Sequence, residues 1–135
     1  MFKINTVSRQ PVYEQLIEQL ELFILSGILH PGDQLPSVRT LSVELSVNPN
    51  TIQKAYGELD TRGVIYSTPG RGSFVAENAV SILSTMKRRK FTDFRAIAQE
   101  LALAGVTEKE LHESIAAIYN GGVPTDIQGD GLITI

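Results

Sequence analysis

The order of three short helical patterns ahead of a glycine-rich turn limits what this chain can fold into more than any other feature. Residues 10–26 place apolar side chains three and four positions apart, which is the spacing of one helix face. A second pattern begins at Ser37 after a proline, and a third begins at Asn48-Pro49, a favoured cap followed by a favoured first helical residue. Two β-type runs, 64–67 and 73–75, flank a turn at residues 68–72. We therefore predict a mainly α chain with one small β-hairpin.

The spacing of these elements indicates a specific motif. The first helix is expected to run from Gln10 to Ser26, with Ser8 or Gln10 as its cap and Pro11 in its first turn. Only a short turn separates the second helix from the third, as a helix-turn-helix requires. Followed by a hairpin, they have the element order of a winged helix-turn-helix, which we expect over residues 1–76. Winged helices also bind proteins, so the fold alone does not choose the partner.

The third predicted helix has an apolar face and a polar face. The apolar positions form its buried stripe: Ile52, Ala55, Tyr56 and Leu59. The opposite face carries Asn50, Gln53, Lys54 and Gly57. Amide side chains both donate and accept hydrogen bonds, which suits base edges in the major groove, and the glycine would let a phosphate approach closely. Taken alone, a solvated helix face explains this pattern equally well.

Two residues of the second helix are candidates for the DNA backbone. That helix crosses the backbone in this motif, so Arg39 can reach a phosphate or a guanine edge. The alternative is a surface arginine paired with Glu44 or Asp60. Ser37 stands beside free N–H groups that form a natural phosphate site, or it simply caps the helix.

The predicted hairpin turn supplies a third contact element. Gly70 and Gly72 flank Arg71, so the backbone is slim and the guanidinium protrudes, as an arginine in a narrow minor groove does. A simple turn with a solubilising charge is the alternative. Three such elements on one side of one motif are harder to explain by chance together than singly.

These segments resemble the GntR family of bacterial transcription regulators. The resemblance covers about residues 4–76 and rests on Leu35–Arg39 (LPSVR), Val47–Ile52 (VNPNTI) and Gly70–Val75 (GRGSFV). It implies that Arg39, the third helix and the wing contact double-stranded DNA. The expected DNA-binding residues are Ser37, Arg39, Asn48, Asn50, Thr51, Gln53, Lys54, Thr68, Gly70, Arg71 and Gly72.

Residues 77–135 are expected to form a helical dimerisation region of two or three helices with a flexible C-terminal tail. Their apolar positions keep near-heptad spacing, in two helices broken near Phe91-Thr92, with Thr92 as a cap, or in one long helix. Such a stripe would lie exposed on a monomer, which argues for a homodimer on a palindromic operator. The expected dimer residues are Val80, Leu83, Phe94, Ile97, Leu101, Leu111 and Ile115.

The short length of this region resembles the YtrA-type branch of the family, whose members dimerise through such a tail and often control transporter operons. The resemblance therefore implies a repressor. A capping box is expected at residues 107–110. The basic run Lys87–Lys90 is open to three interpretations. It could follow DNA phosphates, form a solvated helix face, or pair with Glu108, Glu110 and Glu113 of either subunit; the solvated face is slightly favoured.

Composition excludes several other classes. There is no cysteine and there are only two histidines, so neither disulfides nor a thiolate or zinc site is expected. No catalytic constellation is recognisable, so we predict neither an enzyme nor a cofactor. No signal peptide or apolar run of about 20 residues occurs, which favours a cytoplasmic protein without a membrane partner. A winged-helix adaptor that binds protein is the alternative function.

The net charge of −3 conceals a division along the chain. Residues 34–90 carry eight basic and four acidic groups, whereas residues 91–135 carry two basic and seven acidic groups. The segment expected on DNA is therefore basic, and the acidity belongs to the rest of the chain. Its modest net charge of +4 implies that binding depends more on dimerisation and specific contacts than on bulk charge.

Overall fold

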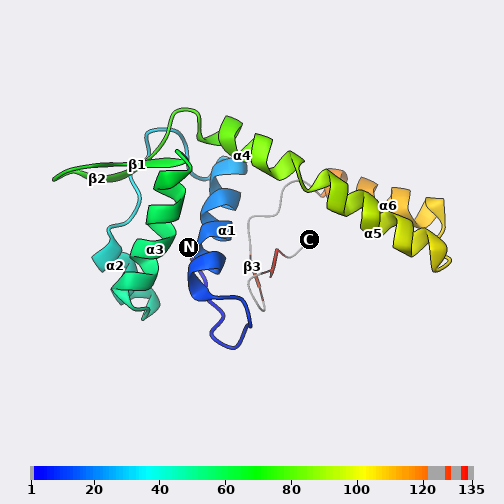
Figure 1. Ribbon diagram of the computed structural model, residues 1–135, viewed down its shortest axis with the longest axis horizontal. Helices are drawn as coiled ribbons and strands as arrows, with labels where there is room; N and C mark the ends of the chain where they lie inside the picture. Colours follow the sequence, from blue (N-terminus) through cyan, green and yellow to red (C-terminus); the bar gives the residue numbers. More distant parts are fainter. Residues whose placement is uncertain (1, 122–126, 129–131, 134–135) are drawn as a thin grey trace.

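The computed structural model describes residues 2–121, 127–128 and 132–133. The first elements are α1 (Val12–Leu25), α2 (Val38–Leu45), α3 (Pro49–Thr61), β1 (Ile65–Thr68) and β2 (Gly72–Val75). They are followed by α4 (Ala79–Arg88), α5 (Phe91–Leu103), α6 (Glu108–Asn120), β3 (Ile127–Gln128) and β4 (Leu132–Ile133). The predicted mainly helical fold with an antiparallel hairpin is confirmed. We call residues 2–88 the head and α5 with α6 the arm, which extends away from the head in Figure 1.

The helix boundaries follow the caps, with one exception. The backbone N–H of Thr40 donates to Ser37 Oγ at 3.0 Å, and that of Asn50 donates to Asn48 Oδ1 at 2.8 Å, as expected for the caps of α2 and α3. The predicted start of α1 is wrong, because the helix begins at Val12 behind Pro11 and has no side-chain cap. A residue before proline is disfavoured in the helical region, so Gln10 cannot join the helix.

The core of the head lies between α1, α3 and the hairpin. The predicted stripes of α1 and α3 are buried, and the hairpin adds three further fully or almost fully buried side chains: Val64, Ile65 and Val75. Two buried glutamines of α1 hold the N-terminal segment. Gln15 Oε1 accepts from the N–H of Asn5 at 2.9 Å, and Gln19 Oε1 accepts from the N–H of Lys3 at 2.8 Å.

Helix α4 packs on α1 as part of the head. Ala79 and Leu83 are fully buried in the same core. Leu83, predicted at the dimer interface, is therefore unavailable to a second copy, and the core continues past the predicted boundary at residue 76. The error has a simple cause: a near-heptad stripe does not show whether its partner is another copy or the same chain.

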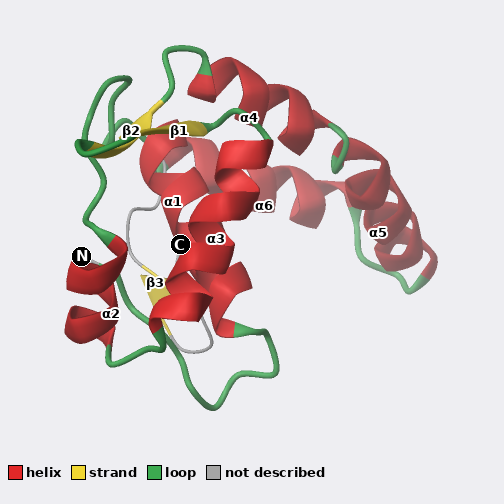
Figure 2. Cartoon of the chain, turned by 60° about the vertical axis from the view of Figure 1, so that its left-hand side comes forward, coloured by secondary structure: helices red, strands yellow, loops and turns green. Residues whose placement is uncertain are grey.

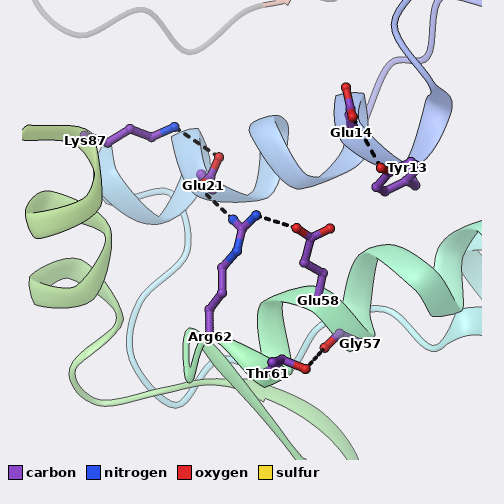
Figure 3. Close-up of polar contacts among 8 residues, drawn as sticks. All are labelled: Tyr13, Glu14, Glu21, Gly57, Glu58, Thr61, Arg62 and Lys87. Carbon is purple, nitrogen blue, oxygen red and sulfur yellow. Dashed lines mark hydrogen bonds and ion pairs between the residues drawn. The ribbon is translucent and has the colours of Figure 1, made fainter. Parts of the chain in front are cut away.

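A buried carboxylate reinforces this attachment. Glu21 of α1, 4% exposed, lies 3.1 Å from Lys87 Nζ of α4 and 3.6 Å from an Arg62 guanidinium nitrogen at the end of α3 (Figure 3). Arg62 also pairs with Glu58 at 2.6 Å. Because a charge buried without partners is costly, this arrangement links α1, α3 and α4.

The arm confirms the prediction of two helices rather than one long helix. The break lies at Arg89-Lys90, and Thr92 does not cap α5, because Lys90 occupies that position without a side-chain hydrogen bond. The capping box of α6 is present: the N–H of Thr107 donates to Glu110 Oε2 at 2.7 Å, and the N–H of Glu110 donates to Thr107 Oγ1 at 3.1 Å. No residue of α5 or α6 is buried.

The predicted flexible tail falls mostly outside the described residues. Within it, β3 pairs with β4 in antiparallel register, with Ile127 opposite Ile133. None of the helices in the described part of the chain has the length and apolar character needed to span a bilayer. Nor do three or more His, Cys, Asp or Glu side chains gather there as a metal site would need.

Candidate nucleic-acid interface

An open groove of about 670 Å³ lies between α3 and the wing, the β1–β2 hairpin. Figure 2 shows α2 and the turn of the wing on the same side of the head. Six of the predicted DNA-binding residues line this groove: Ser37, Gln53, Thr68, Gly70, Arg71 and Gly72. The helix and the turn that were separately predicted to contact DNA therefore form one concave surface.

The remaining predicted residues of α3 and its cap have different surroundings. Asn50 is exposed, whereas Asn48 uses its side-chain oxygen to cap the helix. Gly57 lines the groove, and a Cβ added there would meet nothing within 4 Å. The space beside this glycine is therefore open to a partner from outside the chain.

Lys54 does not share the direction of Gln53. Its ammonium lies 3.9 Å from the centroid of the Tyr13 ring on α1, a cation–π contact at the edge of α3 that faces α1. To contact DNA, this side chain would have to leave the ring. The helical period placed Lys54 on the polar face, but it could not show that α1 offers an aromatic partner.

Arg39 is exposed on α2 and has no ion-pair partner among the residues that the structure describes. The alternative partners behave differently: Asp60 accepts a hydrogen bond from Ser67 Oγ at 3.1 Å, which joins α3 to the wing. The guanidinium of Arg39 is therefore available to an anion. Ser37 both caps α2 and lines the groove, so its two interpretations are compatible.

Sequence reasoning missed two residues that hold the groove together. Gln34 Nε2 donates to the carbonyl of Arg71 at 2.8 Å, so the loop before α2 holds the wing turn. Tyr56 of α3 donates its hydroxyl to the carbonyl of Pro36 at 2.7 Å, which fixes the start of α2. Burial raises the pKa of the Tyr56 phenol, so the donor stays protonated. Neither partner could be found from sequence, because each bond spans about 20 residues or more.

We predict that Gly72→Ala lowers the free energy of unfolding by about 2 kcal/mol. Gly72 has a φ of +116°, and a Cβ there would lie 2.8 Å from Gln34 Nε2. The substitution therefore strains the backbone and displaces the amide that holds Arg71. Thermal denaturation measures the loss.

Gly70→Ala is the matched control, because Gly70 also has a positive φ (+75°) but open space around it. Strain alone should cost about 1 kcal/mol there. Equal losses for the two variants would show that Gln34 does not restrain the wing turn.

The fold and the groove define a class: a winged helix-turn-helix that presents a recognition helix and a wing on one surface. The model of the gntR family of bacterial regulatory proteins matches residues 7–75. The chain is 40% identical over 133 residues to the HTH-type transcriptional repressor YtrA of Bacillus subtilis, covering 93% of this chain and 100% of that protein. The chain therefore belongs to the gntR family.

Solved structures agree with this assignment. A transcriptional regulator from Oenococcus oeni superposes with a TM-score of 0.68 at 31% identity, covering 88% of this chain and 99% of that one. YtrA from Sulfolobus acidocaldarius, a GntR-family transcription factor, gives a TM-score of 0.53 at 30% identity, covering 89% and 97%. Members of the family are DNA-binding regulators rather than enzymes, so this chain acts in DNA-binding transcription regulation.

Proposed function

We propose that the chain is a repressor that binds a palindromic operator as a homodimer in the cytoplasm. The observation that carries this proposal is the apolar face of the arm, which nothing in a single chain covers. Phe94, Ile97 and Leu101 of α5 are 47%, 58% and 39% exposed, and Ile115 of α6 is 38% exposed. A contiguous apolar surface of this kind marks an interaction site, and a second copy would bury it.

In the dimer, each head would read one half-site. Asn50, Thr51 and Gln53 would contact base edges in the major groove, because α3 is the recognition helix of the motif. Arg39 and the N-terminus of α2 at Ser37 would hold the phosphate backbone. Thr68 and the Gly70–Gly72 turn would bring Arg71 to the adjacent minor groove. Two-fold symmetry would place the half-sites about 34–36 Å apart.

Repression is proposed from the likeness to the B. subtilis repressor over nearly the whole chain. Control of a transporter operon is proposed on the resemblance to the YtrA-type branch. An inverted repeat upstream of such an operon is the natural operator to test. The same sequence with its bases scrambled separates specific binding from the non-specific binding of a basic surface, and equal affinity for both would favour a protein-binding adaptor.

We expect Arg39→Ala to weaken binding to the inverted repeat by about ten- to a hundredfold, since alanine cannot make the charge-assisted hydrogen bonds of a guanidinium to DNA. The slope of log affinity against log salt should become shallower by about 0.9 for each phosphate that one subunit no longer neutralises. Fluorescence anisotropy with a labelled duplex over a salt series measures both quantities.

Arg95→Ala, which removes an exposed arginine from the arm, is the control and should leave both quantities unchanged. If the two variants bind the operator equally weakly, Arg39 acts only through net charge.

A further inference from the structure

The exposed charges of the arm are separated along its length. Arg88, Arg89 and Lys90 lie where the arm leaves the head; all are exposed, and none has an ion pair among the described residues. The remaining member of the basic run, Lys87, is held by Glu21. We call Arg88–Lys90 the base of the arm.

The opposite end of the arm is acidic. Glu100 in the last turns of α5 and Glu108 and Glu110 in the first turn of α6 are exposed there. The basic residue among them, Lys109, lies 3.9 Å from Glu113 of its own helix. We call this end the tip; it lies about 20 Å from the base, the length of the 13 residues of α5.

The position of the base argues against a role on DNA. The α4–α5 junction lies across α1 from α2 and the wing turn, and Figures 1 and 2 agree on this arrangement. The basic run therefore faces away from the groove that would hold the half-site. Charges at that distance are also screened, because the Debye length at physiological salt is about 8 Å.

Two-fold symmetry leaves two ways of pairing these arms. If the arms lie parallel, each base meets the other base and each tip meets the other tip, so like charges face one another. If they lie antiparallel, each base meets the partner's tip, and the interface gains two sets of opposite charges. Charge complementarity of this kind fixes orientation more than it adds affinity.

We propose that the arms of two copies pack antiparallel, with the basic base of one against the acidic tip of the other. This rests on the homodimer proposed above and adds its orientation. The occupant of the apolar face is then a second copy in one defined direction. The basic run, which has no role on DNA, becomes the orientation signal of the dimer.

Charge reversal within one chain tests the orientation. The first variant reverses the base, Arg88→Glu/Arg89→Glu; the second reverses the tip, Glu100→Lys/Glu108→Lys; the third combines all four. Glu110 is left in place because it forms the capping box. Sedimentation of the full chain at about 150 mM salt and at about 1 M salt gives the dimer dissociation constant, the higher salt shortening the Debye length to about 3 Å.

Antiparallel packing predicts that each double variant raises the dimer dissociation constant about tenfold or more, from several pairs that turn repulsive. The four-substitution variant should return to within about threefold of the original value, and the differences should shrink at high salt. Parallel packing predicts that a double variant changes little, because one set of like charges only replaces another. That result, or a four-substitution variant as weak as the base variant, overturns the proposal.

Two further measurements make each outcome decisive. An equimolar mixture of the two double variants should dimerise in either orientation, which shows that both remain folded and competent. Lys3→Glu/Arg9→Glu gives the same change in net charge on the head and should leave the dissociation constant within about twofold. If the original chain is monomeric throughout, the homodimer itself fails; if it dimerises without regard to these charges, only the orientation fails.

Discussion

Replacing Leu101 by aspartate is expected to convert the dimer into monomers and to weaken binding to a two-half-site operator by about 10²–10⁴-fold. Leu101 lies on the apolar face of α5 and is 39% exposed in the single chain. In a dimer that covers this face, the carboxylate would lose its water without gaining a partner. Sedimentation measures the dimer, and anisotropy with the operator measures the loss of the second half-site.

Leu103→Asp is the matched control, because the same change is made two residues along α5 at a side chain that is already 83% exposed. It should leave both dimer and operator binding nearly unchanged. The Leu101 variant should also keep the affinity of the original chain for an isolated half-site, since the head is untouched. Equal behaviour of the two variants would show that the apolar face is not the dimer interface.

The parts of the fold that could be predicted are those determined by neighbours in sequence. Ser37, Asn48-Pro49 and the Thr107–Glu110 box mark helix starts because a cap acts within three residues. The alternation of apolar and polar residues in α3 likewise predicted which side is buried. At Pro11 the same approach failed, since the restriction that a proline places on the preceding residue outweighs the capping preference of its neighbours.

The parts that could not be predicted depend on contacts between distant segments. Lys54 was assigned to DNA by its helical position, but its ammonium lies over Tyr13, 41 positions earlier in the chain. The Gln34–Arg71 bond, which holds the wing beside the groove, joins residues 37 positions apart. Local periodicity predicts which face of a helix is polar, whereas only the packed chain decides which of those polar side chains remain available to DNA.

Arg39 illustrates the opposite case. From the sequence it was a DNA contact or one half of a surface ion pair, and no local rule could choose between them. The structure engages Asp60 with Ser67 instead and leaves the guanidinium unpaired among the described residues. An unpaired arginine costs little on a solvated surface, so its freedom is consistent with a role that begins only when DNA arrives.

Leu83→Ala is expected to lower the free energy of unfolding by about 3 kcal/mol while leaving the dimer dissociation constant of the folded chain nearly unchanged. Leu83 is fully buried against the core of the head, so its truncation removes apolar packing and leaves a cavity between α1 and α4. Urea denaturation at a fixed protein concentration measures the first quantity, and sedimentation measures the second.

Val80→Ala separates this effect from one on association, because Val80 lies on the same helix but is 42% exposed. It should cost less than about 1 kcal/mol. If Leu83→Ala instead weakened the dimer and left unfolding unchanged, Leu83 would belong to the interface, as its spacing in the sequence suggests. If the expected result is obtained, α4 is a structural part of the head, and Glu21 with Lys87 then holds the start of the arm to the reading surface. The direction in which the arm leaves the head, and so the distance between two heads, is then determined by the packing of α4 on α1.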